Sequence, residues 1–145
     1  MKLKICWIGK TKENAVETLT NEYVKRIGRY LPISVHELRA EAALLELAAK
    51  ERARPLLVLL DASGRQMSSE QLAGFIRQCQ EKATQTLLFA VGPADGWSET
   101  VRTAAAHLLS LSKMTLAHEI ARVVLLEQIY RGCTILAGHP YHLGH

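Results

Sequence analysis

The chain has 145 residues, of which 48% are hydrophobic and 22% are charged. This length is typical of one domain with its own core, and it excludes a disulfide-stabilised miniprotein, a coiled-coil rod and a multidomain enzyme. Lysine and arginine together number 18 against 14 aspartates and glutamates, which gives a formal net charge of +4. A modest basic excess is compatible with a polyanionic partner.

The first part of the chain alternates predicted strands and helices. Residues 3–8 alternate apolar side chains with lysine and predict a strand that ends at Gly9. Residues 13–27 place apolar side chains three or four positions apart, which predicts a helix. Residues 33–38 predict a second strand, and residues 40–53 have the alanine-, leucine- and glutamate-rich composition of a helix.

The middle of the chain continues this alternation. The apolar run at residues 56–60 is typical of a strand buried on both faces of a parallel sheet, and residues 62–64 predict a turn after it. Ser68 is the expected N-cap of the next helix, with Gln71 completing a capping box. Residues 87–91 predict another buried strand.

The last part contains a helix over residues 98–107, a short strand over 108–111 and a long helix over 117–137. Thr115 is the expected N-cap of the long helix, and Gly138 lies just past its end. The alternation of strands and helices predicts an α/β fold with a mainly parallel sheet, in one domain that spans the whole chain.

The last predicted helix is apolar around most of its circumference, so it needs cover on several sides. One cover is the chain's own sheet, and we expect the other to be a second subunit. The sequence therefore predicts a homodimer that buries this helix. The apolar side chains concerned are Ile120, Val123, Val124, Leu125, Leu126, Ile129, Tyr130, Cys133, Ile135 and Leu136.

No targeting signal or membrane span is predicted. The N-terminus MKLKICWIGK has only a short apolar stretch, and no apolar run approaches the roughly 18 residues that cross a bilayer. Cys6, Cys79 and Cys133 are scattered and form no CxxC motif. Such cysteines are typical of reduced, packed thiols, so we expect a soluble, cytoplasmic protein.

Three segments that follow predicted strands are candidate ligand-binding loops, because ligands collect at the carboxyl ends of parallel strands. They are LDASG at residues 60–64, VGPADG at 91–96 and LSKMTL at 111–116. Plain connections between elements are the alternative interpretation. The phosphate-binding motifs GxGxxG and GxxxxGK[ST] are absent, as is the hydrolase motif GxSxG.

Two further groups of residues are candidates for chemistry. His118 and Arg122 lie four positions apart and therefore on one helical face, where they suit an anionic substrate; a surface ion pair between Glu119 and Arg122 is the alternative. In the tail, Tyr141 and His142 suit stacking and hydrogen bonding against RNA.

Histidines also recur at intervals of three in the tail, at His139, His142 and His145. Zinc sites need three or four rigidly held protein ligands, and Cys133 is the only nearby thiol. We therefore predict no metal site.

The order of these motifs resembles a known family. GRQMSSEQLA after LLD, VGPADGWS, LSLSKMTLAHEIARVVLLEQIYR and HPYH, together with the opening MKLKICWIGKTKE, are similar to the ribosomal large-subunit pseudouridine N3-methyltransferases of the SPOUT class. The resemblance covers nearly the whole chain. It implies a parallel α/β sheet with a C-terminal trefoil knot, a homodimer, and S-adenosylmethionine as cofactor.

The activity that this resemblance implies is methylation of N3 of a pseudouridine in 23S ribosomal RNA. Because a net charge of +4 neutralises few phosphates, we expect the substrate to be the assembled ribosome. Because the sulfonium is already an activated methyl donor, no metal is required. Arg122 is the expected phosphate-binding or anion-stabilising residue, and His142 the expected base. Tyr141 and His118 are expected RNA contacts. The positions that match the family's cofactor contacts are Leu60, Gly92, Leu111, Ser112, Lys113, Met114, Thr115 and Leu116.

Three features depart from the family's pattern. Pro93 stands where a second glycine is usual and removes a backbone N–H. Residues 36–55 are shorter than usual and poor in lysine, and residues 143–145 extend the tail. The alternative functions are an RNA-binding relative without catalysis, a tRNA methyltransferase of the same class, and a small-molecule enzyme that uses Asp61 or Asp95 as acid or base.

Overall fold

The computed structural model describes residues 1–93 and 95–144. Its five-stranded sheet is parallel throughout, with strand order β2-β1-β4-β3-β5, which confirms the predicted α/β class. The strands are β1 (Lys2–Ile8), β2 (Ile33–Leu38), β3 (Leu56–Gln66), β4 (Thr86–Val91) and β5 (His107–Ser110). The helices are α1 (Asn14–Ile27), α2 (Glu41–Ala49), α3 (Ser69–Glu81), α4 (Glu99–Ala104), α5 (His118–Ala137) and the 3-10 turn η1 (His142–Gly144). The C-terminal knot stays a prediction.

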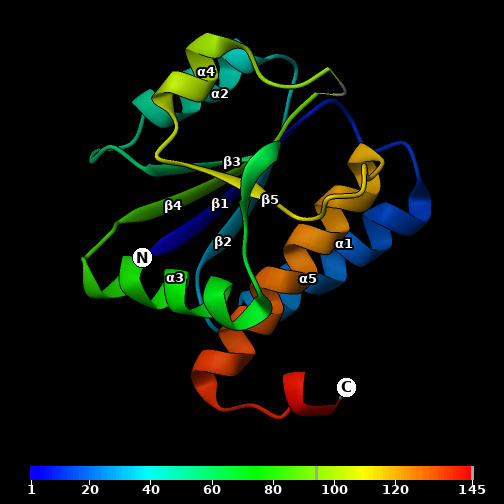
Figure 1. Cartoon of the computed structure of the whole chain (residues 1–145), viewed down its shortest axis with the longest axis vertical. Coiled ribbons are helices and arrows are strands. Elements are labelled where there is room, and N and C mark those ends of the chain that lie inside the picture. The colour runs from blue at the N-terminus through cyan, green and yellow to red at the C-terminus, as the bar shows by residue number, and fades with distance from the viewer. Residues whose placement is uncertain (94, 145) are drawn as a thin grey trace.

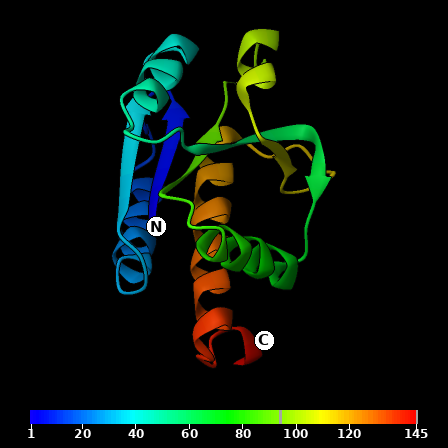
Figure 2. The same cartoon turned by 90° about the vertical axis from the view of Figure 1, so that its left-hand side faces the viewer.

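Helices cover both faces of the sheet (Figures 1 and 2). α1, α3 and α5 lie on one face, and α2 and α4 on the other. Because side chains alternate along a strand, the sheet builds a separate core on each face. On β1, Ile5 and Trp7 belong to the core under α1, α3 and α5, while Cys6 belongs to the core under α2 and α4.

The end of β3 differs from the prediction. Residues 62–64 belong to β3 instead of a turn, and the pairing with β5 shifts register between Leu60 and Arg65. Gly64 permits this close pairing, since a Cβ at that position would lie 2.6 Å from the carbonyl carbon of Leu108. The strand therefore bends where the first predicted loop begins.

Helix ends follow local capping chemistry. At the start of α3, the Ser68 side chain accepts the Gln71 N–H at 3.1 Å, and the Gln71 side chain accepts the Ser68 N–H at 2.8 Å, as predicted. The predicted N-cap Thr115 is wrong: α5 is preceded by Ala117, which makes no side-chain cap. Gly138 ends α5 with a φ of +73°, a conformation that favours glycine.

The other helix boundaries differ by a few residues. α2 ends at Ala49 instead of residue 53, and α4 ends at Ala104, so that His107 already belongs to β5. None of the helices in the described ranges combines the length and apolar character needed to cross a membrane.

The cysteines are free thiols inside the core, as predicted. Burial raises the pKa of Cys6 to about 12 and that of Cys133 to about 11, and it also raises the pKa of Cys79. Their thiolate forms are therefore rare at neutral pH, and we assign them to packing.

The last helix is covered on two sides within the chain, where it packs against α1 and α3 (Figure 1). Leu125, Leu126 and Ile129 are fully buried there. In contrast, Ile120 is 50% exposed, and Val123 and Val124 are only partly covered. The second subunit expected over this side of α5 stays a prediction.

Candidate active site

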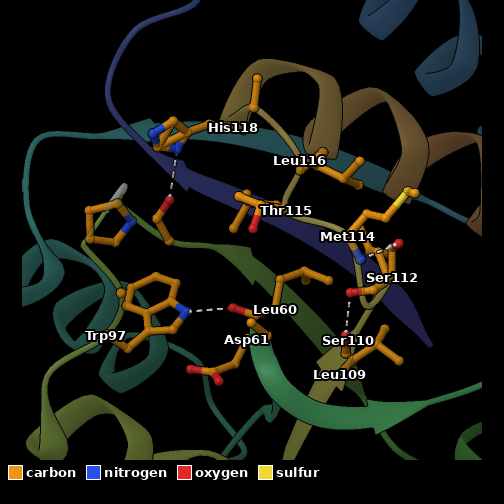
Figure 3. Close-up of a pocket in the computed structure, with 18 of the residues that line it drawn as sticks. Leu60, Asp61, Trp97, Leu109, Ser110, Ser112, Met114, Thr115, Leu116 and His118 are labelled. Carbon is orange, nitrogen blue, oxygen red and sulfur yellow. Dashed lines mark hydrogen bonds between the residues drawn. The ribbon is translucent and has the colours of Figure 1, made fainter.

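A cavity of about 540 Å³ opens at the carboxyl ends of β4 and β5, next to the point where the register of β3 shifts (Figure 3). This volume lies in the usual range for small-molecule sites. The three predicted loops meet in it, and all of the residues predicted to bind cofactor line its wall: Leu60, Gly92, Leu111, Ser112, Lys113, Met114, Thr115 and Leu116. His118 lines it as well. Ala94, in the second loop, lies outside the described residues.

Two serines fold the loop between β5 and α5. The Ser110 hydroxyl donates to the Ser112 carbonyl at 3.0 Å, and the Ser112 hydroxyl accepts the Met114 N–H at 2.9 Å. The side chains of Lys113 and Met114 are exposed, and that of Met114 is 78% accessible. The loop is therefore held by local hydrogen bonds, with its long side chains at the open rim of the cavity.

Side chains also bind the carbonyl groups at two strand ends. The Trp97 Nε1–H donates to the Leu60 carbonyl at 2.9 Å, and His118 Nδ1 lies 3.3 Å from the Gly92 carbonyl (Figure 3). Because a carbonyl oxygen only accepts, His118 must carry its hydrogen on Nδ1 to make this bond, which leaves Nε2 as an acceptor when the ring is neutral. The first turn of α5 is thus joined to the end of β4.

Asp61 lines the cavity, but its carboxylate is already bonded. It accepts the Ser63 N–H at 2.9 Å and the Ser63 hydroxyl at 2.6 Å, and it pairs with Arg102 at 2.5 Å. Burial alone would raise the pKa of Asp61, but the Ser63 hydrogen bonds and the Arg102 charge outweigh it and hold the pKa below its usual range. The geometry therefore gives no support to Asp61 as the acid of a small-molecule enzyme.

Arg122 lies on the same side of α5 as His118, but it is only 3% exposed. Its guanidinium donates to the Thr11 hydroxyl and the Ile8 carbonyl, both at 3.2 Å, and lies 4.9 Å from the centre of the Trp7 ring. Within residues 1–93 and 95–144, its Nε has no hydrogen-bond partner. Burial lowers the pKa of Arg122, and the nearby acidic groups partly offset that effect. Arg122 thus fastens the loop after β1, and direct contact with RNA phosphate requires some of these bonds to break.

Two carboxylates hold the same loop from other elements. Glu37, on β2, accepts the Thr11 N–H at 3.2 Å and the Thr11 hydroxyl at 2.8 Å. Glu119, on α5, accepts the N–H groups of Lys12 and Glu13 at 3.0 and 3.1 Å. These backbone hydrogen bonds, the one from Glu13 foremost, lower the pKa of Glu119. Instead of the simple surface pair with Arg122 considered above, Glu119 joins the loop to the last helix.

The tail residues lie at the other end of α5. A helix rises about 1.5 Å per residue, so the 20-residue α5 separates the cavity from the tail by roughly 30 Å. Figure 2 shows the C-terminus at the far end of this helix. Within one chain, the structure brings His118 to the predicted cofactor-binding residues, but not Tyr141 or His142.

Both ring nitrogens of His142 are engaged. Nε2 lies 2.6 Å from Glu70 Oε1 on α3, and Nδ1 lies 3.1 Å from a guanidinium nitrogen of Arg131. Because a guanidinium only donates, Nδ1 accepts, and Nε2 carries the hydrogen that Glu70 accepts. In this arrangement neither nitrogen is free to accept a proton from a substrate.

Tyr141 is also held by the body of the protein. Its ring packs on Tyr130 at 4.7 Å between centroids, and the Arg131 guanidinium lies 4.8 Å from its centre. Burial, followed by a hydrogen bond with Tyr23, raises the pKa of Tyr141 to about 12. The phenol is therefore neutral at physiological pH.

In the described ranges, no cluster of three or more His, Cys, Asp or Glu side chains is arranged to hold a metal ion. His139 instead accepts the backbone N–H of Tyr141 through Nδ1 at 3.1 Å. His145, the last histidine of the spacing noted above, lies outside the described residues.

Five residues that line the cavity lie outside the predicted loops and His118: Trp97, Leu109, Ser110, Ala117 and Ala121. Trp97 is the one of these whose side chain bonds the end of another segment, the Leu60 carbonyl. A large aromatic residue directly after the glycine-containing loop that follows a buried strand was the available signal. The indole donates to a carbonyl on β3 that is remote in sequence. No spacing pattern along the chain could predict such a contact.

A parallel α/β sheet with a loop-lined cavity at its carboxyl edge defines a class of proteins that bind ligands at strand ends. Residues 1–142 match the family described as "Predicted SPOUT methyltransferase". The chain belongs to this family.

Curated relatives match over the full length. The "Ribosomal RNA large subunit methyltransferase H" of Koribacter versatilis (strain Ellin345) is 53% identical over 146 residues, covering 100% of both chains. The protein of the same name from Geobacter sp. (strain M21) is 45% identical, covering 98% of this chain and 99% of its own.

Among solved structures, the fold is similar to the SpoU methyltransferase AviRb from Streptomyces viridochromogenes, in complex with the cofactor AdoMet. The TM-score is 0.55 at 14% sequence identity, over 90% of this chain and 57% of that one. This chain thus spans little more than half the length of AviRb, and the likeness concerns the fold alone.

Proposed function

We propose that this protein is an S-adenosylmethionine-dependent methyltransferase that modifies N3 of a pseudouridine in 23S ribosomal RNA, on the assembled ribosome in the cytoplasm. The single observation that carries the proposal is that residues of all three predicted ligand-binding segments, 60–64, 91–96 and 111–116, line one cavity. The names of the full-length relatives support ribosomal RNA as the substrate.

The residues of the cavity fit the proposed cofactor. Leu60, Leu111 and Leu116 provide apolar surface for an adenine ring. Asp95 and Lys113 provide charges of both signs at the exposed rim, which suits the ammonium and carboxylate of a methionine moiety. Pro93 cannot donate from its backbone nitrogen, so hydrogen bonds to the cofactor must come from other loop residues.

When bound, S-adenosylmethionine supplies a methyl group on a positively charged sulphur, which is already activated for transfer. The protein must orient the pseudouridine and accept the proton that N3 loses when it is methylated. His118 lies at the cavity with an acceptor nitrogen when neutral, which supports a role beside the RNA base. Arg122 lies one helical turn from His118 and carries a positive charge. This charge suits stabilisation of the anion that forms when N3 loses its proton.

The roles proposed for His142 and Tyr141 require a second copy of the chain. In one chain the length of α5 keeps them away from the cavity, so they serve it only if the tail of one subunit reaches the cavity of its partner. The partly exposed apolar side of α5 supports this homodimer. His142 must then exchange its contact with Glu70 or Arg131 to act as a base.

The direct test is transfer of labelled methyl groups to ribosomes that lack the modification, followed by mass spectrometry of the digested RNA. We expect one labelled nucleotide, a pseudouridine methylated at N3 in the large-subunit RNA. Naked 23S RNA is the matched substrate control and should react poorly, because a net charge of +4 neutralises few phosphates. Label in tRNA, or no label in ribosomes despite cofactor binding, would contradict the proposal.

A further inference from the structure

We propose that Trp97 is a positioning residue of the cofactor cavity, and that its indole is the reason why position 92 is glycine. This inference rests on the proposed function, since it concerns how the cavity holds S-adenosylmethionine. It assigns no chemistry to Trp97. The residue acts through the two strand ends that its ring contacts.

The first contact ties β3 to the loop after β4. Trp97 is 8% exposed and belongs to the core under α2 and α4, with Leu59 and Val101. Its ring is fixed by this packing, and its Nε1–H donates a hydrogen bond to the Leu60 carbonyl at 2.9 Å. Leu60 is the last residue before the register of β3 shifts, so the indole bonds the strand where its regular pairing ends.

The second contact fixes the end of β4. A Cβ added at Gly92 would lie 2.7 Å from Cε2 and 2.8 Å from Nε1 of Trp97, and its three nearest neighbours all belong to that ring. The glycines with φ in the left-handed region are Gly9, Gly96 and Gly138, among the described residues. Space, and not backbone conformation, therefore requires a glycine at position 92, and the indole occupies that space.

One side chain thus sets the separation of two positions that line the cavity. On its other side, Gly92 offers its carbonyl to His118, so its peptide lies between the indole and the first turn of α5. We expect a change in the ring to shift β3 at Leu60 and the end of β4 together. Substitutions at positions 92 and 97 are consequently expected to be coupled in their effect on cofactor binding.

The test measures the dissociation constant of S-adenosylmethionine by calorimetry. Trp97→Phe keeps an aromatic ring but loses the donor, and should weaken binding about 5- to 10-fold. Gly92→Ala should weaken binding by about 30-fold or more in the wild-type background, since the methyl group meets the indole. In a Trp97→Leu background the same alanine should cost less than about 3-fold, because the pyrrole edge is gone.

Gly74→Ala is the matched control. Gly74 lies on α3, and a Cβ there would meet nothing within 4 Å, so binding should be unchanged. Unfolding midpoints of all variants separate a local effect from a general loss of structure. If Trp97→Leu fails to fold, Trp97→Phe alone decides the role of the donor.

The outcomes distinguish this inference from the proposed function. Unchanged affinity in Trp97→Phe, or an equal cost of Gly92→Ala in both backgrounds, overturns the role of Trp97 while the wild-type chain still binds cofactor. A merely structural Trp97 lowers the unfolding midpoint but leaves the two positions additive in binding. A wild-type chain that binds no S-adenosylmethionine overturns the proposed function, and the role of Trp97 with it.

Discussion

The buried guanidinium of Arg122 joins three parts of the sequence that meet beside the cavity. It stacks on Trp7 at the end of β1, bonds the loop that follows, and belongs to the first turns of α5. A buried cation needs hydrogen bonds to offset the loss of water, and here the loop supplies them. Arg122 therefore contributes to the stability of the site as well as to its charge.

We predict that Arg122→Ala lowers the free energy of unfolding by about 3 kcal/mol, because it removes hydrogen bonds and a cation–π contact from a buried position. Urea denaturation measures the change. Arg77→Ala, an exposed exchange on α3, is the control and should change stability by less than about 0.5 kcal/mol. If Arg122→Ala abolishes methylation while stability stays at the wild-type value, Arg122 acts on the RNA and not on the loop.

Glu119 gives a prediction about pH. Its pKa in the folded protein lies below the ordinary value of 4.5, so the folded state binds fewer protons than the unfolded state in that region. Its contribution is therefore complete above the ordinary value and disappears as the pH falls through the folded-state value.

We expect the unfolding midpoint to fall as the pH is lowered from about 5 towards 3, and to fall less in Glu119→Gln than in the wild type. Thermal unfolding at stepped pH measures both slopes. Glu81→Gln, at the end of α3, is the comparison variant and should follow the wild-type curve. Parallel curves for Glu119→Gln and the wild type would exclude the contribution of this carboxylate to acid stability.

At the scale of the elements, the sequence was informative wherever local chemistry decides the structure. The capping box at Ser68 and the glycine at position 138 define helix ends through neighbours a few residues away, and both were predicted. The course of β3 past residue 61 was not, because Ala62, Ser63 and Gly64 have the composition of a turn. Their place in the sheet depends on pairing with β5, which lies over 40 residues further on.

Two glycines in helical settings predict opposite effects of one substitution. Gly138→Ala should destabilise the protein by about 1 kcal/mol, because its φ of +73° strains an L side chain. Gly74→Ala should stabilise it by about 0.5–1 kcal/mol, because it lies inside α3 with open space around its Cα. Chemical denaturation of the two variants measures the change in the free energy of unfolding. Changes of the same sign in both variants would show that local backbone conformation does not determine the effect of the alanine.

For the whole molecule, the main feature is the distance between the cavity and the tail. The segments that line the cavity could be predicted, since ligands collect at the carboxyl ends of the strands in a parallel sheet. The engagement of Arg122, Trp97 and His142 could not, because each contacts groups that are remote in sequence. Contacts of this kind form only when the helices have packed on the sheet.

The proposed homodimer gives a complementation test at this scale. A Gly92→Ala chain has a damaged cavity, and a His142→Ala chain has a damaged tail. If the tail serves the partner's cavity, an equal mixture forms heterodimers with one intact site, and about a quarter of wild-type methyl transfer returns. Each variant alone is the control. No recovery despite subunit exchange, shown by sedimentation of tagged chains, would place tail and cavity in independent roles.

The contact between Glu119 and the backbone of Lys12 spans 107 positions of the sequence. On a ribosome that synthesises the chain from its amino end, more than 100 further residues must be added before the segment after β1 can contact Glu119. Parallel strands with such distant connections fold slowly compared with locally connected helices. A nascent chain that has not yet released α5 therefore lacks part of the cavity wall, so we expect cofactor binding to begin only after this helix has emerged.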